Sequence, residues 1–276
     1  MKKIHIEFSD ERLITPSGLV FVGQILGKSS FVKKINRAPI SKDYLQKQIK
    51  NGDVLLTYIG MLCQGKPQYE AVREMMDDPD YYKYALGISY AIPSAETLRQ
   101  RFDMIGDSLS DNEEKTVGIR TIYEITERTI DRYGQYFIVP DIELGTYWTN
   151  TSLPDETVID LYHAHGESEQ YHSEIKTDMD VERLPSGKFE SNKLVLELTM
   201  IAYNILRIIG QESLKKKDAP GQKKIHRRRI RTVISNLMQF AGHLTEHAGR
   251  LVLSIGRSNR WRFTFKRFYD SFAFIT

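Results

Sequence analysis

The stretch LYHAHGESEQYHSEIKTDMD, residues 161–180, carries the most informative pattern of polar residues in this chain. Within it Glu169 and Lys176 are seven residues apart, nearly two turns of an α-helix, so both side chains lie on one helix face. Tyr162 and His165 join that face if the helix continues through Gly166; if Gly166 breaks it, the later pair alone shares the face. The sequence therefore predicts a helix that presents a carboxylate and an amine together.

Such a face suits phosphoryl transfer, because a carboxylate helps to hold divalent metal ions while a nearby cation grips a DNA phosphate. The same residue types are common on solvated helix faces, which is the simpler interpretation of the segment in isolation. The neighbouring acids Asp155, Asp160, Asp178 and Asp180 are expected to be first-turn or exposed helix acids.

The flanking segments predict one buried helix and a strand region. Apolar residues between Lys193 and Ile209 are interrupted by a few polar ones, which predicts a buried helix that falls short of a membrane span. Residues 136–149 are rich in β-branched and aromatic residues, and Pro140 and Gly145 divide them into two predicted short strands.

The first half of the chain reads as short helices separated by Gly and Pro residues. Ser94 is placed to cap a helix that includes Leu98 and Phe102. A longer helix is predicted from Asn112 to Tyr133 from its apolar spacing. The predicted fold class is therefore α+β, predominantly helical, with an N-terminal helical module.

The last part of the chain combines a predicted helix, from Ile230 to Leu244, with a short terminal strand, from Leu251 to Ile255. The end, WRFTFKRFYDSF (261–272), is interpreted as packing aromatics with charged ends rather than as a base-stacking surface. The single cysteine, Cys63, excludes an internal disulfide framework and a cysteine zinc cluster, and is interpreted as a core residue.

The formal net charge of +3 hides an uneven distribution. Between Ser213 and Arg231 there are nine Lys or Arg residues and a single acid, Asp218. A block this dense is either a solvated segment or a phosphate-binding surface. The first residues turn charged before an apolar run of signal-peptide length can form, so the protein is expected in the cytosol with no membrane partner.

Four residues of this stretch, Tyr162, His165, Glu169 and Lys176, are separated by two, three and six residues. This spacing resembles the Tyr-Arg-Glu-Lys signature of bacterial insertion-sequence transposases. His165 stands where that family has arginine, and it lacks the permanent charge and the fork of a guanidinium. Further segments resemble the same family: LITPSGL (13–19), GDVLL (52–56), DDPDY (77–81), IPSAETLRQRFD (92–103), NTSLPDETVIDLY (150–162) and KFESNKLVLELTMIAYNILR (188–207).

The resemblance implies a DDE transposase with a ribonuclease-H-like core, in which two aspartates on separate strands join the helix glutamate, Glu169, to hold Mg²⁺. Here the first strand phrase, Asp141-Ile142-Glu143, passes directly into LGTYWTN (144–150), which resembles the strand just before the glutamate helix. The expected core is thus internally deleted: Asp141 and Glu143 are the candidates for the first aspartate, and the second has none. The implied domains are a helical DNA-binding or dimerisation module, 1–135, and a catalytic remnant with C-terminal helices, 136–276.

The resemblance also implies double-stranded DNA as a partner, at the terminal inverted repeats of a mobile element, a homodimer or a mixed dimer with intact transposase, and a cytoplasmic, nucleoid-associated location. The residues expected to contact DNA are Tyr162, His165, Lys176, Lys215, Lys216, Lys217, Lys223, Lys224, Arg227, Arg228 and Arg229. The favoured hypothesis is a catalytically inactive, DNA-binding derivative. The alternatives are an active metal-dependent strand transferase or nuclease that uses Asp141, Glu143 and Glu169, and a pseudogene product or protein-binding scaffold.

Overall fold

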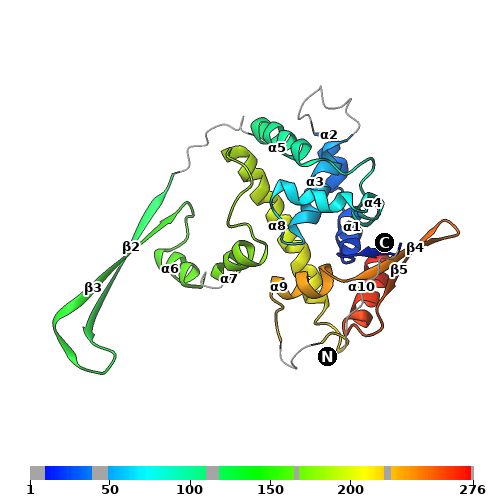
Figure 1. Ribbon diagram of the computed structural model, residues 1–276. Helices are drawn as coiled ribbons and strands as arrows, with labels where there is room; N and C mark the ends of the chain where they lie inside the picture. Colours follow the sequence, from blue (N-terminus) through cyan, green and yellow to red (C-terminus); the bar gives the residue numbers. More distant parts are fainter. Residues whose placement is uncertain (1–9, 39–48, 110–117, 165–167, 221–224, 275–276) are drawn as a thin grey trace, which may run out of the picture. The chain divides into compact units, whose positions relative to one another are not determined.

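The computed structural model describes residues 10–38, 49–109, 118–164, 168–220 and 225–274. Helices and strands are both present, which confirms the predicted α+β composition. The chain divides into a large unit, Met1–Asp111 with Ser173–Thr276, and a small unit, Asn112–His172 (Figure 1). Both ends of the chain thus belong to one unit, and the boundary expected between residues 135 and 136 falls inside the other.

The N-terminal part of the large unit is mainly helical, as expected. Its elements are strand β1 (Arg12–Ile14), helices α1 (Leu19–Gly27), α2 (Phe31–Arg37) and α3 (Asn51–Leu62), the 3₁₀ turn η2 (Tyr69–Met76), and helices α4 (Pro79–Leu86) and α5 (Ala95–Leu109). The predicted cap of α5 is confirmed, because the Ser94 Oγ accepts a hydrogen bond from the Thr97 backbone N–H at 3.1 Å.

The C-terminal part of the large unit mixes helices with two strands. Its elements are the π-helical turn η4 (Glu174–Asp178), helices α8 (Phe189–Glu212) and α9 (Ile230–Val233), the π-helical turn η5 (Ile234–Met238), strands β4 (Gly242–His247) and β5 (Arg250–Ile255), and helix α10 (Arg262–Phe274). Strands β1, β4 and β5 form an antiparallel sheet in that order, so the predicted terminal strand is confirmed.

The helix predicted from Ile230 to Leu244 is wrong beyond Met238. The carbonyl of Met238 accepts a hydrogen bond from the backbone N–H of Gly18 at 3.1 Å, and Leu244 lies in β4. A Cβ atom on Gly18 would lie 1.9 Å from the Leu237 carbonyl oxygen, so the two backbones meet directly. This contact between distant parts of the chain ends the helical segment, and apolar spacing alone does not reveal it.

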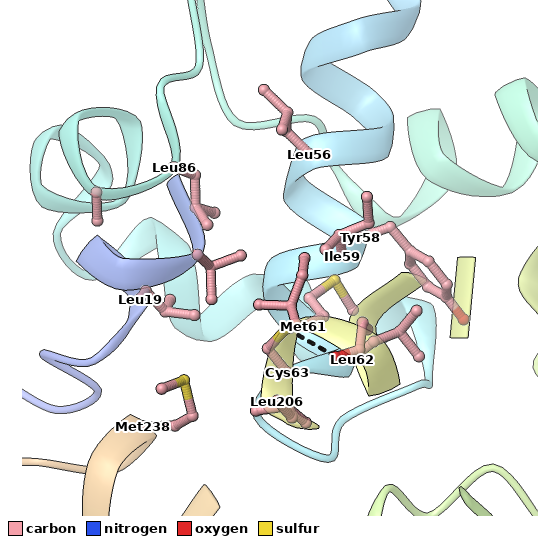
Figure 2. Close-up of a cluster of buried hydrophobic side chains, with 14 of the residues drawn as sticks. Leu19, Leu56, Tyr58, Ile59, Met61, Leu62, Cys63, Leu86, Leu206 and Met238 are labelled. Atoms are coloured by element: carbon pink, nitrogen blue, oxygen red, sulfur yellow. Dashed lines mark hydrogen bonds between the residues drawn. The ribbon is translucent and has the colours of Figure 1, made fainter. Parts of the chain in front are cut away.

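Helix α3 lies in the core of the large unit. Its residues from Gly52 to Leu62 are all buried, as expected for a helix that is largely apolar around its circumference. Figure 2 shows side chains of α3 gathered with Leu206 of α8 and with Cys63, whose Sγ lies 4.0 Å from the Ala202 carbonyl oxygen. Burial raises the pKa of the Cys63 thiol, and its assignment to the core is confirmed.

Two further sequence predictions concern packed helices. Helix α8 has 24 residues, which is longer than predicted, and its length and composition alone would allow it to cross a membrane. However, 56% of its most apolar 18-residue segment is buried inside the protein, which confirms a core helix. The aromatic end of the chain also packs, since the Phe265 and Phe268 rings of α10 lie 4.6 Å and 5.7 Å from the ring of Phe21.

The small unit is built on a long β-hairpin. Strand β2 (Arg120–Ile130) pairs antiparallel with β3 (Tyr136–Thr149), and helices α6 (Asp155–Ala164) and α7 (Ser168–Ser173) follow. The turn is organised by Asp131, whose carboxylate accepts hydrogen bonds from the backbone N–H groups of Tyr133 and Gln135, both at 2.8 Å.

Two predictions for this hairpin are wrong. The helix predicted from Asn112 to Tyr133 is a strand in its described part from Arg120 to Ile130, because β-branched residues there pair with β3. The two short strands predicted in residues 136–149 are one strand. Pro140 lies where the pairing register shifts, so the ladder accommodates a residue without an N–H.

Candidate nucleic-acid interface

The four residues of the signature pattern are distributed over three elements. Tyr162 lies on α6, Glu169 on α7 and Lys176 on η4, while His165 lies outside the described residues. Glu169 belongs to the small unit and Lys176 to the large one. Glu169 and Lys176 thus lie on the contiguous elements α7 and η4, and the junction with α6, at residues 165–167, lies outside the described residues.

Tyr162 is positioned by a small polar cluster in the small unit. Its ring meets the ring of Tyr147 edge-on, with centroids 4.9 Å apart. The Tyr147 hydroxyl donates a hydrogen bond to the Glu124 carboxylate at 2.5 Å, which raises the pKa of Tyr147 to about 12. The Nε2 of His163 lies 3.5 Å from the same carboxylate. These contacts fix α6 against the hairpin and leave the Tyr162 side chain 64% exposed.

The two strand carboxylates proposed as metal ligands lie elsewhere on the hairpin. Glu143 forms an ion pair with Arg128 at 2.7 Å, and Asp141 is the register partner of Arg128. At about 3.3 Å per strand residue, they lie about 13 and 20 Å along β3 from Tyr147, the residue that contacts α6. Glu169 itself is exposed on α7.

A metal centre needs several ligands within one small region. Among the described residues, no three Asp, Glu, His or Cys side chains form a group that could hold a metal ion. Two-metal phosphoryl transfer requires several carboxylates around ions about 4 Å apart. The described side chains do not fit such a centre, and no catalytic step is derived through Mg²⁺.

The basic segment is instead organised by acids within the signature stretch. Glu174 is 3% exposed, and its carboxylate accepts hydrogen bonds from the Tyr203 hydroxyl at 2.9 Å and from the Arg227 guanidinium. The backbone N–H of Ile230 donates to it at 3.4 Å. Burial and the bond to Glu174 raise the pKa of Tyr203 to about 12. Glu174 thus anchors the start of α9 to η4.

Asp178 makes a second anchor one helical turn further on. The Nε of Arg229 lies 2.7 Å from one of its carboxylate oxygens, and the Nε of Arg231 lies 3.2 Å from the other. Burial by itself would raise the Asp178 pKa, but the bonds from Arg229 and from the Arg231 backbone N–H hold it below its usual range. The expectation of an exposed helix acid is therefore wrong for Asp178.

Sequence reasoning missed both anchors, although one signal was present. Glu174 and Asp178 are four residues apart, so they share a helix face and can meet the same partner segment. The partners themselves, Arg227, Arg229 and Arg231, lie about fifty positions away, and spacing does not identify them.

Not all the basic residues point outward. The guanidinium of Arg228 is buried: it donates hydrogen bonds to the Ser213 hydroxyl and, at 3.2 Å, to the Pro220 carbonyl. It also stacks over the Trp261 ring at 4.7 Å, and burial lowers the pKa of Arg228. Arg227 faces Glu174 in the same inward manner. The lysines at 215, 216 and 217 are exposed, and Lys223 and Lys224 lie outside the described residues.

Three cations gather on the surface around Asp178, and we name them the η4 cation cluster: Lys176, Arg229 and Arg231. Their side chains are 59%, 53% and 63% exposed. Arg229 also reaches Thr177, the neighbour of Lys176, at 3.4 Å. Lys176 pairs with the exposed Glu182 at 3.1 Å. The cluster holds long cationic side chains on a fixed base, an arrangement that suits contact with phosphates.

We expect the acid side of the stability curve to depend on Asp178. The pKa of Asp178 is lower in the folded chain than in the unfolded one. At pH values between these two pKa values the folded chain binds fewer protons, so the free energy of unfolding rises with pH there. The contribution is complete above about pH 4, the ordinary aspartate pKa, and is lost as pH falls through the lowered value.

Asp178→Asn should therefore flatten the pH dependence of the free energy of unfolding below about pH 4, measured by urea titration at each pH. Asp180→Asn is the matched control, because Asp180 is exposed and its positive φ suits asparagine. A pH dependence that Asp178→Asn leaves unchanged would contradict the proposed role of this carboxylate.

The fold and the η4 cation cluster together define an α+β protein with a basic surface at η4, the element in which the sequence pattern Tyr-x2-His-x3-Glu-x6-Lys ends. A family model described as Transposase DDE domain group 1 matches residues 117–273, more than half of the chain, and the chain belongs to this family. No curated protein and no solved structure matches it.

Proposed function

We propose that this chain is a DNA-binding derivative of a DDE transposase that occupies the terminal inverted repeats of its element without transferring strands. The observation that supports this proposal best is the η4 cation cluster, because it places exposed cations on a buried base within the signature stretch. Bound there, the protein would compete with an intact transposase for the same DNA ends.

The electrostatics of the cluster favour a phosphate as its ligand. Two arginines share the single carboxylate of Asp178, so the three groups together carry one net positive charge. A guanidinium has five N–H donors, and the bonds to Asp178 use only part of them. The remaining donors can bind a phosphate oxygen while the carboxylate keeps its partners. Lys176 lies beside them, and a phosphate would compete with Glu182 for its ammonium.

The proposal includes the loss of the central strands of a ribonuclease-H-like core. A two-stranded hairpin is marginal by itself and normally belongs to a larger sheet. Large apolar side chains on β2 and β3 are exposed: Ile125 at 70%, Ile138 at 101%, Ile142 at 68%, Leu144 at 61% and Trp148 at 76%. Apolar side chains exposed at this density fit a hairpin without the elements that would cover its faces, and a sheet of two strands fits the loss of neighbouring strands.

The test is the salt dependence of DNA binding. For a duplex that carries the inverted repeat, the slope of log K against log salt is negative and should become less steep by about 0.9 for each phosphate contact removed. Arg231→Gln and Lys176→Gln should each reduce its steepness by about that amount, and the double variant by about twice as much. Asp178 keeps Arg229 and the backbone N–H of residue 231 in every variant, so the anchor remains.

Lys266→Gln is the matched control, because Lys266 is an exposed cation paired with an acid on α10, outside residues 1–135 and away from the cluster in sequence. Its slope should equal that of the unmodified protein. A slope that the cluster variants leave unchanged, while binding persists, would show that DNA contacts another surface; no binding at any salt concentration would refute the proposed function.

A further inference from the structure

A second surface of the large unit, independent of the η4 cation cluster, has the form of a ligand site. A groove of about 900 Å³ lies between α1, α4, the β4–β5 hairpin and α10, which are neighbours in Figure 1. Sites for small molecules are usually clefts of about 300 to 1,000 Å³ with mainly apolar walls. The size of this groove therefore falls within the range of a binding site.

The walls of the groove are apolar and aromatic. Strand β5 contributes Leu251, Val252 and Leu253, and α10 contributes Phe263 and Phe265. Several of these walls remain open to solvent, for example Val252 at 46% and Phe263 at 61% exposed. Apolar surface that is concave, contiguous and exposed gains free energy when an apolar ligand covers it.

The charged groups of the groove have one sign. Among the described residues, Arg262 and Lys266 are the charged side chains that line it, and no carboxylate does. Lys266 pairs with Asp270, one helical turn further along α10, at 3.1 Å, whereas no carboxylate of the described residues pairs with Arg262. Together Arg262, Lys266 and Asp270 carry one net positive charge, which one anionic group neutralises.

A polar group in the wall adds a second indication of a ligand. The Oε1 atom of Gln24 is buried and has no hydrogen-bond partner in the described part of the protein, and Gln24 lines the groove. Buried acceptors are nearly always paired, so a vacant one beside an open groove is unusual. A small rotation of this amide would present either its donor or its acceptor to a bound molecule.

We propose that this groove binds an amphiphile with an unbranched apolar tail and a single anionic head, the chemistry of a fatty-acid carboxylate. The tail lies along the apolar walls of β5 and α10, and the carboxylate accepts hydrogen bonds from Arg262 and Lys266. The guanidinium of Arg262 lies 4.4 Å over the Phe263 ring and donates to the Asn259 carbonyl at 3.2 Å, so these contacts hold it in the groove wall with donors left for a carboxylate. The site does not depend on DNA binding.

Titration calorimetry of the intact protein with dodecanoate, below its micelle concentration, tests the proposal. One dodecanoate should bind per chain. Each methylene contributes about 0.8 kcal/mol, so decanoate should bind about fifteenfold more weakly. Dodecyltrimethylammonium, with the same tail and the opposite charge, should bind more weakly than dodecanoate. Arg262→Gln should weaken dodecanoate about tenfold by removing a charge-assisted hydrogen bond.

A matched pair of variants separates the groove from other apolar surfaces. Val252→Trp should fill the groove and abolish binding, while Val139→Trp, the same change at an exposed valine of the β2–β3 hairpin, should leave it unaltered. Thermal unfolding curves establish that both variants fold. Binding that survives Val252→Trp, or that does not distinguish the two head-group charges, would overturn the proposal as adsorption to apolar surface.

Discussion

Replacing Glu174 by alanine is expected to lower the free energy of unfolding by about 3 to 5 kcal/mol, the usual cost of removing one partner from a buried ion pair. The Glu174 side chain is 4% exposed, and the change leaves the Arg227 guanidinium without its carboxylate and the Ile230 N–H without its acceptor. Urea unfolding followed by circular dichroism measures the effect.

Glu182→Ala is the control for Glu174→Ala. Glu182 is a glutamate of the same region, but it is 60% exposed and pairs with an exposed lysine, so its removal should cost less than about 1 kcal/mol. Combining Glu174→Ala with Arg227→Met should recover part of the loss, because no unpaired charge then remains buried. Equal effects of Glu174→Ala and Glu182→Ala would contradict the anchoring role of Glu174.

The same substitution connects stability with the proposed function. Glu174 holds the segment that carries Arg229 and Arg231, so a loosened segment would also lose its fixed position on η4. Glu174 and Asp178 therefore fix the positions of the surface cations Arg229 and Arg231, although neither acid contacts DNA in the proposal.

The sequence was sufficient for features that depend on local chemistry. The Ser94 cap is a contact between residues three apart, and the burial of Cys63 follows from the apolar residues around it in α3. The strand from Arg250 to Ile255 and the packing of the aromatic C-terminal segment have the same local origin. Such features are determined by neighbouring residues, and a single sequence displays them.

The features that failed depend on partners distant in sequence. The spacing of Ile122 and Ile125 favours a helix face, but the pairing of Ile122 with Tyr147 makes the segment a strand, on which residues three apart point to opposite faces: Ile122 is 3% exposed and Ile125 is 70% exposed. The basic segment likewise looks solvated until Glu174 and Asp178 are known to face it. From a dense run of basic residues in a sequence one cannot tell which side chains are exposed to solvent and which form ion pairs with buried acids.

The central claim, binding without strand transfer, rests on the arrangement of the carboxylates. Glu143 is paired with Arg128, Asp141 lies further along the same strand from α6, and the described acids form no metal-binding group. We therefore expect the Glu169→Gln variant to behave like the unmodified chain in every assay of strand cleavage, because a single helix carboxylate does not assemble a two-metal centre.

The most direct test incubates the unmodified protein and its Glu169→Gln variant with an end-labelled duplex that carries the flanking inverted repeat, in Mg²⁺ and separately in Mn²⁺. Retardation and strand cleavage are scored on the same samples, with an unrelated duplex of equal length as the control. The account predicts retardation of the repeat duplex by both proteins and cleavage by neither. Cleavage by the unmodified protein that Glu169→Gln abolishes would contradict it, because the shortened core would then assemble a working metal site.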